Sequence, residues 1–126
     1  MTQIPYGRQY IDNKDVKLVS KSLTSRLITT GKFVSNFEKK VKKYLNCKYV
    51  KTCNSGTAAI HLAMLSIGLK KNDVVLMPAI NFIASYNLAK SMQAKIHLVD
   101  VDPETGQITP NKIEECIKKN NLKKIK

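Results

Sequence analysis

The fold is decided by the stretch Tyr49-Val50-Lys51-Thr52-Cys53-Asn54-Ser55-Gly56-Thr57. Residues 49–54 are rich in β-branched and aromatic side chains, which predicts a strand. Residues 58–67 are rich in alanine and leucine, which predicts a helix that is buried on most of its surface and ends at Gly68. Ser55, Gly56 and Thr57 are therefore expected to form the turn between a strand and the start of a helix.

A turn of this kind is suited to an anion. The first backbone N–H groups of a helix have no partner within the helix, and the helix dipole places partial positive charge there. Gly56 lets the backbone approach a ligand closely, and the hydroxyls of Ser55 and Thr57 can add hydrogen bonds. Binding of a phosphate ester is one interpretation, and an ordinary helix N-cap without a ligand is the other.

Strands and helices continue to alternate after this turn. The pattern predicts an apolar strand at 73–77, a helix at 81–91, a strand at 95–101, a turn at 102–106 and a helix at 110–120. Residues 122–126 are typical of the approach to another strand. This order predicts an α/β fold with a mostly parallel sheet flanked by helices.

Two helices are predicted before the first strand. Asp12 and Asn13 can cap a helix that ends by Arg26, and a turn at 29–31 leads into a second helix over 33–45. We interpret the lysines at 39, 40, 42 and 43 as the solvated face of this second helix rather than as a binding patch. The chain is thus expected to be one domain, with N-terminal helices at 1–46 and the alternating region at 47–126.

A second candidate site follows the strand at 73–77. In an open α/β sheet, ligands bind beyond the carboxyl ends of the strands, so residues 78–85 share an edge with the residues that follow Asn54. Phe82 lies in this segment, and its ring can stack on a flat heteroaromatic ligand. Packing of Phe82 into the core is the alternative that the local pattern leaves open.

Composition narrows the class of protein. The chain has 126 residues, 43% of them apolar and 25% charged, which excludes a disordered tail, a collagen-like chain or a disulfide-stapled mini-protein. Of the 22 basic residues behind the net charge of +13, only Arg8 and Arg26 are arginine. This favours a solvated lysine surface over specific nucleic-acid recognition, because arginine is the usual ligand of phosphates and bases.

The remaining signals favour a cytoplasmic protein without a metal. The three cysteines have no C-x-x-C spacing, no secretory signal or membrane span is visible, and a reducing compartment fits best. His61 and His97 have no second ligand at metal-binding spacing. Asp100 and Asp102 are expected to serve the turn before Pro103.

Taken together, several short motifs give the chain a strong resemblance to one family. The motifs are Ile4-Pro5, Thr30-Gly31-Lys32, Phe37-Glu38, Asn54 to Leu62, Asn72-Asp73-Val74-Val75, Pro78 with Phe82 to Ser85, and Asp100-Val101-Asp102 followed by Thr105 and Ile108. In this order and at these intervals the chain resembles the DegT/DnrJ/EryC1/StrS family, the sugar aminotransferases of pyridoxal-phosphate fold type I.

The resemblance implies roles for particular residues. Gly56 and Thr57 match the positions that hold the phosphate of pyridoxal 5'-phosphate, and Ser55 belongs to the same loop. Phe82 matches the aromatic residue that stacks on the pyridine ring, which favours stacking over core packing. Thr30 and Gly31 match a loop near the mouth of the active site, where a role in substrate binding is expected.

The resemblance also implies a fold and an activity. Residues 1–126 correspond to the N-terminal portion of the cofactor-binding large domain, with its sheet incomplete and its strands not all neighbours. Family members are cytoplasmic homodimers that transfer an amino group, commonly from glutamate, to a nucleotide-linked keto-deoxysugar used in surface polysaccharide or glycan biosynthesis. The cofactor carries the chemistry, and the protein orients it.

Departures from the family pattern affect the expected activity. Asn72 and Gln93-Ala94 replace usual glycines. The aspartate that pairs with the pyridinium nitrogen and the lysine that forms the Schiff base match positions beyond Lys126, so we expect a truncated, inactive segment that does not hold the cofactor stably. Two alternatives stay open: a noncatalytic remnant, and a basic module for nucleotides or nucleic acid.

Overall fold

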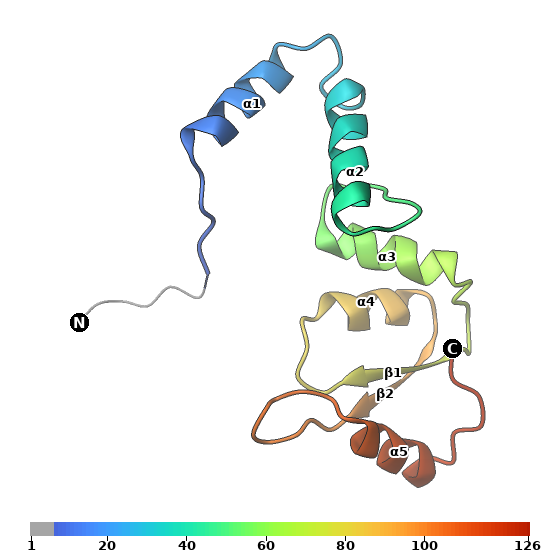
Figure 1. Cartoon of the computed structure of the whole chain (residues 1–126). Coiled ribbons are helices and arrows are strands. Elements are labelled where there is room, and N and C mark those ends of the chain that lie inside the picture. Colours follow the sequence, from blue (N-terminus) through green and yellow to red (C-terminus); the bar gives the residue numbers. More distant parts are fainter. Residues whose placement is uncertain (1–6) are drawn as a thin grey trace. The chain divides into compact units, whose positions relative to one another are not determined.

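The computed structural model describes residues 7–126, so the Ile4-Pro5 motif lies outside the described part. The chain divides into two compact units, Met1–Thr52 and Cys53–Lys126. The first unit contains helices α1 (Asn13–Leu23) and α2 (Lys32–Tyr44). The second contains, in order, α3 (Gly56–Ser66), β1 (Val74–Pro78), α4 (Ala84–Ser91), β2 (Lys95–Val99) and α5 (Pro110–Lys119) (Figure 1).

The start of α1 is set by its cap. The Asp12 carboxylate accepts hydrogen bonds from the N–H groups of Lys14 and Asp15, at 2.7 and 3.1 Å. In return, the Asp15 carboxylate accepts from the Asp12 N–H at 3.0 Å. This reciprocal capping box satisfies the free donors of the first turn and confirms the predicted cap. Neither α1 nor α2 has a buried residue.

The second unit is built around a parallel pair of strands. β1 and β2 pair in register from Val74 opposite Lys95 to Pro78 opposite Val99. α4 connects them, and in Figure 1 α4 and α5 lie on opposite sides of the strands. The described residues thus show the predicted α/β arrangement, because two parallel strands need a crossover connection, here a helix.

The core belongs to this second unit. Its fully or nearly fully buried side chains come from both strands, α4, α5 and the connections between them: Leu69, Met77, Ala84, Ala89, Val99, Val101 and Cys116. Ala89 and Val99 have no exposed surface. This small apolar centre holds α4 and α5 against β2.

The prediction of a strand at 49–54 is wrong for the described residues, which have no regular structure there. A strand is held by hydrogen bonds to a neighbour, and β1 pairs with β2 rather than with this segment. The prediction that the helix at 58–67 is mostly buried is also wrong. α3 has no buried residue, because α4 packs against one side of it and the remaining apolar surface is exposed.

The end of the chain behaves as predicted for the approach to a strand. The Lys126 N–H donates to the Val74 carbonyl of β1 at 2.9 Å. The Asp73 carbonyl points toward β2, because it accepts from the Lys95 N–H. Backbone groups of successive residues in a strand point in opposite directions, so the N–H and C=O groups of Val74 point away from β2. Lys126 therefore lies at the opposite edge of β1.

Candidate functional site

The predicted anion-binding turn forms the first turn of α3. Ser55 is the N-cap residue, in extended conformation, and its hydroxyl accepts from the Ala58 N–H at 3.1 Å. Among residues 7–126, the N–H groups of Gly56 and Thr57 form no hydrogen bond. The turn therefore offers two free backbone donors at the positive end of the helix dipole.

Gly56 keeps the space above these donors open. A Cβ atom added at Gly56 would have no neighbouring heavy atom within 4 Å. The backbone there does not adopt the left-handed conformation that favours glycine. What the missing side chain provides is therefore access to the helix start rather than a special backbone angle.

Phe82 lies in the loop that follows β1. Its side chain is 75% exposed, so it is not part of the core of this chain. The ring borders a hollow of about 270 Å³ that is also lined by Met77, Tyr86 and Leu98. The loop carries an aromatic face at the carboxyl end of β1, where ligands of open α/β sheets bind.

Asn81 holds this loop, a role that the sequence analysis missed. Its side-chain oxygen accepts from the Phe82 N–H at 2.8 Å, and its NH₂ group donates to the Ser85 hydroxyl at 2.9 Å. These contacts join the loop to the start of α4, which begins at Ala84 rather than at residue 81 as expected. An asparagine placed between a strand end and a helix is the signal that was available.

The two predicted cofactor segments lie at the same end of the second unit. α3 packs along α4, and both helices begin on the side where β1 ends (Figure 1). Ser55, Gly56 and Thr57 start α3, while Phe82 shortly precedes α4. The arrangement places a helix start with free donors and an exposed aromatic ring on one side of the unit.

Thr30 and Gly31 belong to the first unit and lead into α2. Gly31 has φ of +108°, a conformation that favours glycine, and a Cβ atom there would lie 3.6 Å from the Leu27 Cβ. Its carbonyl accepts from the Ser35 N–H at 3.1 Å. A hollow of about 440 Å³ beside Gly31 is lined by Arg26, Leu27 and Phe33. Within this unit the loop is therefore a sharp, exposed turn beside a shallow surface depression.

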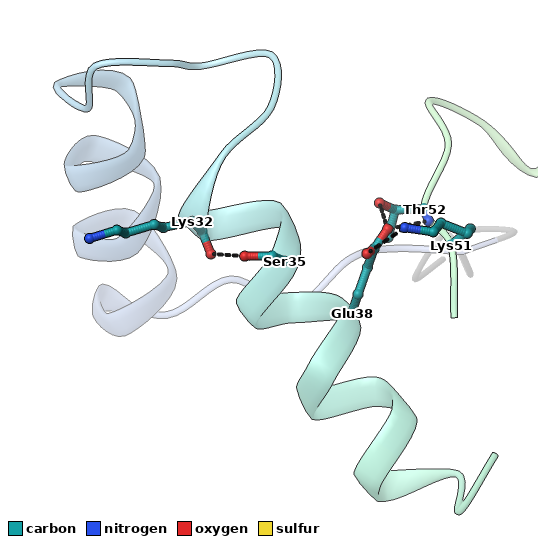
Figure 2. Close-up of polar contacts among 5 residues, drawn as sticks. All are labelled: Lys32, Ser35, Glu38, Lys51 and Thr52. Carbon is teal, nitrogen blue, oxygen red and sulfur yellow. Dashed lines mark hydrogen bonds and ion pairs between the residues drawn. The ribbon is translucent and has the colours of Figure 1, made fainter. Parts of the chain in front are cut away.

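A second polar cluster, which sequence reasoning did not find, surrounds Glu38 of α2 (Figure 2). One carboxylate oxygen accepts from the Thr52 N–H at 3.1 Å and from the Thr52 hydroxyl at 3.2 Å. The other oxygen accepts from the Lys51 ammonium at 3.3 Å. We call Glu38, Lys51 and Thr52 the Glu38 cluster. The Phe37-Glu38 motif was visible in the sequence, but nothing there identified its partners.

The contacts of the Glu38 cluster favour the ionised form of its carboxyl group. The Thr52 N–H has the largest effect and holds the pKa of Glu38 below its ordinary value. Burial opposes it, and the Lys51 ammonium and the Thr52 hydroxyl each add a smaller lowering effect. The Glu38 side chain is 17% exposed, whereas that of Lys51 is 84% exposed. The ion pair is therefore open to water on the side of the Lys51 ammonium.

Other kinds of site receive no support from the part of the chain that is described. Across residues 7–126, no group of three or more His, Cys, Asp or Glu side chains is placed to hold a metal ion. No helix in the same range is long and apolar enough to cross a membrane.

Asp102 accepts from the N–H groups of Glu104 and Thr105 and from the Thr105 hydroxyl, which confirms its predicted role in the turn.

Comparison with known sequences gives relatives along most of the chain. A UDP-4-amino-4,6-dideoxy-N-acetyl-beta-L-altrosamine transaminase of Campylobacter jejuni is 34% identical over 118 residues, which cover 94% of this chain and 31% of that protein. A 3-oxo-glucose-6-phosphate:glutamate aminotransferase of Bacillus subtilis is 38% identical over 111 residues, which cover 85% of this chain and 25% of that protein. The chain thus spans about a third of the length of the first relative and about a quarter of the length of the second.

Solved structures agree with these relatives. NtdA of Bacillus subtilis, solved with bound cofactor PMP, superposes with a TM-score of 0.74 at 38% identity, over 85% of this chain and 26% of that one. A GDP-4-keto-6-deoxy-D-mannose-3-dehydratase of E. coli with bound hydrated PLP superposes with a TM-score of 0.82 at 25% identity, over 91% and 31%. The described part of the chain therefore has part of the fold of these enzymes.

The family assignment rests on the sequence as a whole. Residues 9–125 match the DegT/DnrJ/EryC1/StrS aminotransferase family. This range includes every predicted site residue and extends through both units. The chain belongs to the DegT/DnrJ/EryC1/StrS aminotransferase family.

Proposed function

We propose that this chain carries the phosphate-binding end of a pyridoxal-phosphate-dependent aminotransferase that acts on sugars. The observation that carries the proposal is the start of α3, where the N–H groups of Gly56 and Thr57 have no acceptor among residues 7–126. Backbone donors at a helix start favour a phosphate group. The family assignment and the PMP-bound relative make pyridoxal 5'-phosphate the fitting source of that phosphate.

The residues present fit this cofactor. The phosphate would accept from the N–H groups of Gly56 and Thr57 and from the Thr57 hydroxyl. The Ser55 hydroxyl already accepts from the Ala58 N–H, which leaves its own proton free for donation to the phosphate. The exposed ring of Phe82 would cover one face of the cofactor ring and shield it from water.

The chemistry is divided between cofactor and protein. When bound, the cofactor carries the amino group between donor and acceptor and delocalises the charge that develops at carbon. Residues 55–57 and 82 supply binding and orientation. None of the 20 lysines matches the family's covalently bonded lysine, so we expect no turnover and no firm cofactor retention from these 126 residues alone.

The substrate class is the finer part of the proposal. The names of both reported relatives specify amino transfer to a sugar derivative, one carrying UDP and one a phosphate, and the second names glutamate as donor. We propose a keto-deoxysugar linked to a nucleotide as acceptor and glutamate as donor, with the Thr30-Gly31 loop beside the substrate. The family implies a cytoplasmic homodimer for the whole enzyme, and three free cysteines are compatible with a reducing compartment.

The proposal is tested by NMR titration of the chain with pyridoxamine phosphate. This compound has no aldehyde, so it does not react with surface lysines as pyridoxal phosphate does. We expect weak binding with amide shift changes concentrated at Gly56 and Thr57, and with pyridoxamine, which lacks the phosphate, we expect none. Ser55→Ala should weaken binding about fivefold, which corresponds to one lost hydrogen bond of about 1 kcal/mol.

Thr109→Ala is the matched control. Thr109 caps α5 as Ser55 caps α3, with its hydroxyl accepting from the Lys112 N–H, but Pro110 removes one backbone donor from the start of α5. Both variants lose an N-cap of about 1 kcal/mol, so they match in helix stability. Equal weakening by the two variants, or shift changes spread over the lysine side chains, would contradict the phosphate site.

A further inference from the structure

The segment that leads into α3 has few restraints of its own. Residues 49–54 are without regular structure, so their N–H and C=O groups are not held by a sheet. Between the end of α2 and Ser55, the strongest fixed point is Thr52, whose N–H and hydroxyl both donate to Glu38. Only Cys53 and Asn54 separate Thr52 from Ser55.

The contact is unusual among the side-chain hydrogen bonds of residues 7–126. Nearly all of these join residues four or fewer positions apart, whereas Glu38 reaches 13 and 14 positions along the chain. The other long-range case is a thiol contact from Cys116 to the Leu98 carbonyl at 3.9 Å. Glu38 therefore makes the principal long-range polar contacts of the first unit.

Glu38 is also well placed to act as a fixed point. It lies in the middle of α2, a 13-residue helix, so its backbone is held by helical hydrogen bonds on both sides. Its side chain is largely shielded from water, and it is ionised at neutral pH, so both of its carboxylate oxygens accept hydrogen bonds. A carboxylate that accepts both a backbone N–H and the hydroxyl of the same residue restrains that residue's backbone and side chain together.

We propose that Glu38 is a positioning residue for the anion-binding turn: by fixing Thr52, it restrains the backbone of residues 53–57 and holds the donors of Gly56 and Thr57 ready for a phosphate. The role as a phosphate site rests on the proposed function, but the restraint itself does not. Glu38 touches neither phosphate nor substrate in this role. It acts through the peptide that it holds.

Lys51 contributes little to this restraint. Its ammonium is 84% exposed, and ion pairs between exposed groups are weak and screened by salt. The proposal therefore separates the two partners of Glu38. Loss of the contact to Thr52 should loosen the turn, whereas loss of Lys51 should not.

The test measures backbone order in the ligand-free chain as well as ligand affinity. Glu38→Ala should raise amide hydrogen exchange at Thr52 about tenfold or more, because a charge-assisted hydrogen bond is lost. It should also lower the ¹⁵N order parameters of residues 55–57 and weaken pyridoxamine phosphate binding about threefold to tenfold. Glu38→Gln retains an acceptor for the Thr52 N–H and should stay within about threefold of the unmodified chain.

Two matched variants serve as controls. Lys51→Ala removes the ion pair alone, and Glu115→Gln changes another helical glutamate that forms an exposed ion pair with Lys112. Neither should alter order at residues 55–57. If Glu38→Ala lowers the helix content, Thr52→Val carries the same test, because it removes only the hydroxyl donor and should raise exchange at residue 52 about twofold to threefold.

Each outcome decides a separate question. Unchanged order at residues 55–57 in Glu38→Ala, whether or not exchange at Thr52 rises, overturns the positioning role. Loosening by Lys51→Ala to the same extent also overturns it, since the effect would then be electrostatic. If the turn loosens while the unmodified chain binds no pyridoxamine phosphate, the restraint stands and the proposed function fails.

Discussion

Replacing Val99 by alanine is expected to destabilise the second unit by about 2–3 kcal/mol. Val99 ends β2 and has 0% of its surface exposed. The substitution removes two carbon atoms from the core, which costs about 1.6 kcal/mol at 0.8 kcal/mol each. A cavity that closes only in part adds about 1 kcal/mol. Both terms act on a core of seven buried side chains, which has little capacity to absorb the loss.

The preceding residue gives a matched control. Leu98 lies on the same strand but is 56% exposed, since neighbouring residues of a strand face opposite sides. Leu98→Ala should therefore cost at most about 1 kcal/mol although it removes more carbon atoms. Far-UV circular dichroism followed against urea measures both variants. With a slope of about 1–2 kcal/mol per molar, Val99→Ala should lower the midpoint by about 1–3 M.

The difference between the two urea midpoints tests whether Val99 belongs to the core. Equal midpoints for Val99→Ala and Leu98→Ala would refute the assignment of Val99 to the core and the register of β1 with β2. A loss below about 0.5 kcal/mol for Val99→Ala would do the same, because surface substitutions fall in that range. Complete loss of the unfolding transition in Val99→Ala would agree with the prediction. It would mean that the free energy of unfolding of the unit is smaller than the expected loss of about 2–3 kcal/mol.

Three further predictions concern the ends of elements. Gly31→Ala should destabilise the start of α2 by about 1–3 kcal/mol, because φ of +108° strains any residue with a Cβ atom, and amide exchange near Ser35 would report it. Asp12→Ala should cost α1 about 1 kcal/mol and lower its helix content in ¹³C chemical shifts, and unchanged shifts would argue against the capping box. The Thr105 N–H and then its hydroxyl hold the pKa of Asp102 below its ordinary 3.8, so the turn should be held above that pH and loosen as the pH falls through the depressed pKa. The Thr105 amide shift should follow this titration, and Asp102→Asn should abolish it.

Local signals allowed all five helices and both strands of the described residues to be predicted, with bounds that differ by a few residues. The capping side chain of Asp12 marks a helix start, and the apolar runs at 74–78 and 95–99 form β1 and β2. The strand at 49–54 failed, since a strand exists only beside a neighbour and composition says nothing about which segment that is. For the same reason, the apolar sequence of α3 could not show how little of it is covered.

The candidate site was predictable in part. The sequence of one turn was enough to predict that Ser55 caps a helix and that free backbone donors follow it. The exposure of Phe82 depends on what packs beside it, which no local pattern reports. Glu38 and Asn81 were missed as organising residues, because a polar side chain can be assigned a role only when its partners are known.

The contact between Lys126 and Val74 has a practical consequence for handling this chain. Leu76 is the next residue of β1 whose backbone N–H and C=O groups point away from β2. These groups have no partner among residues 7–126. Exposed peptide groups of this kind recruit extended segments from other molecules, and apolar side chains nearby strengthen the attachment. Self-association that increases with protein concentration is therefore to be expected, and each binding or unfolding experiment should be repeated over a dilution series so that assembly is not mistaken for folding.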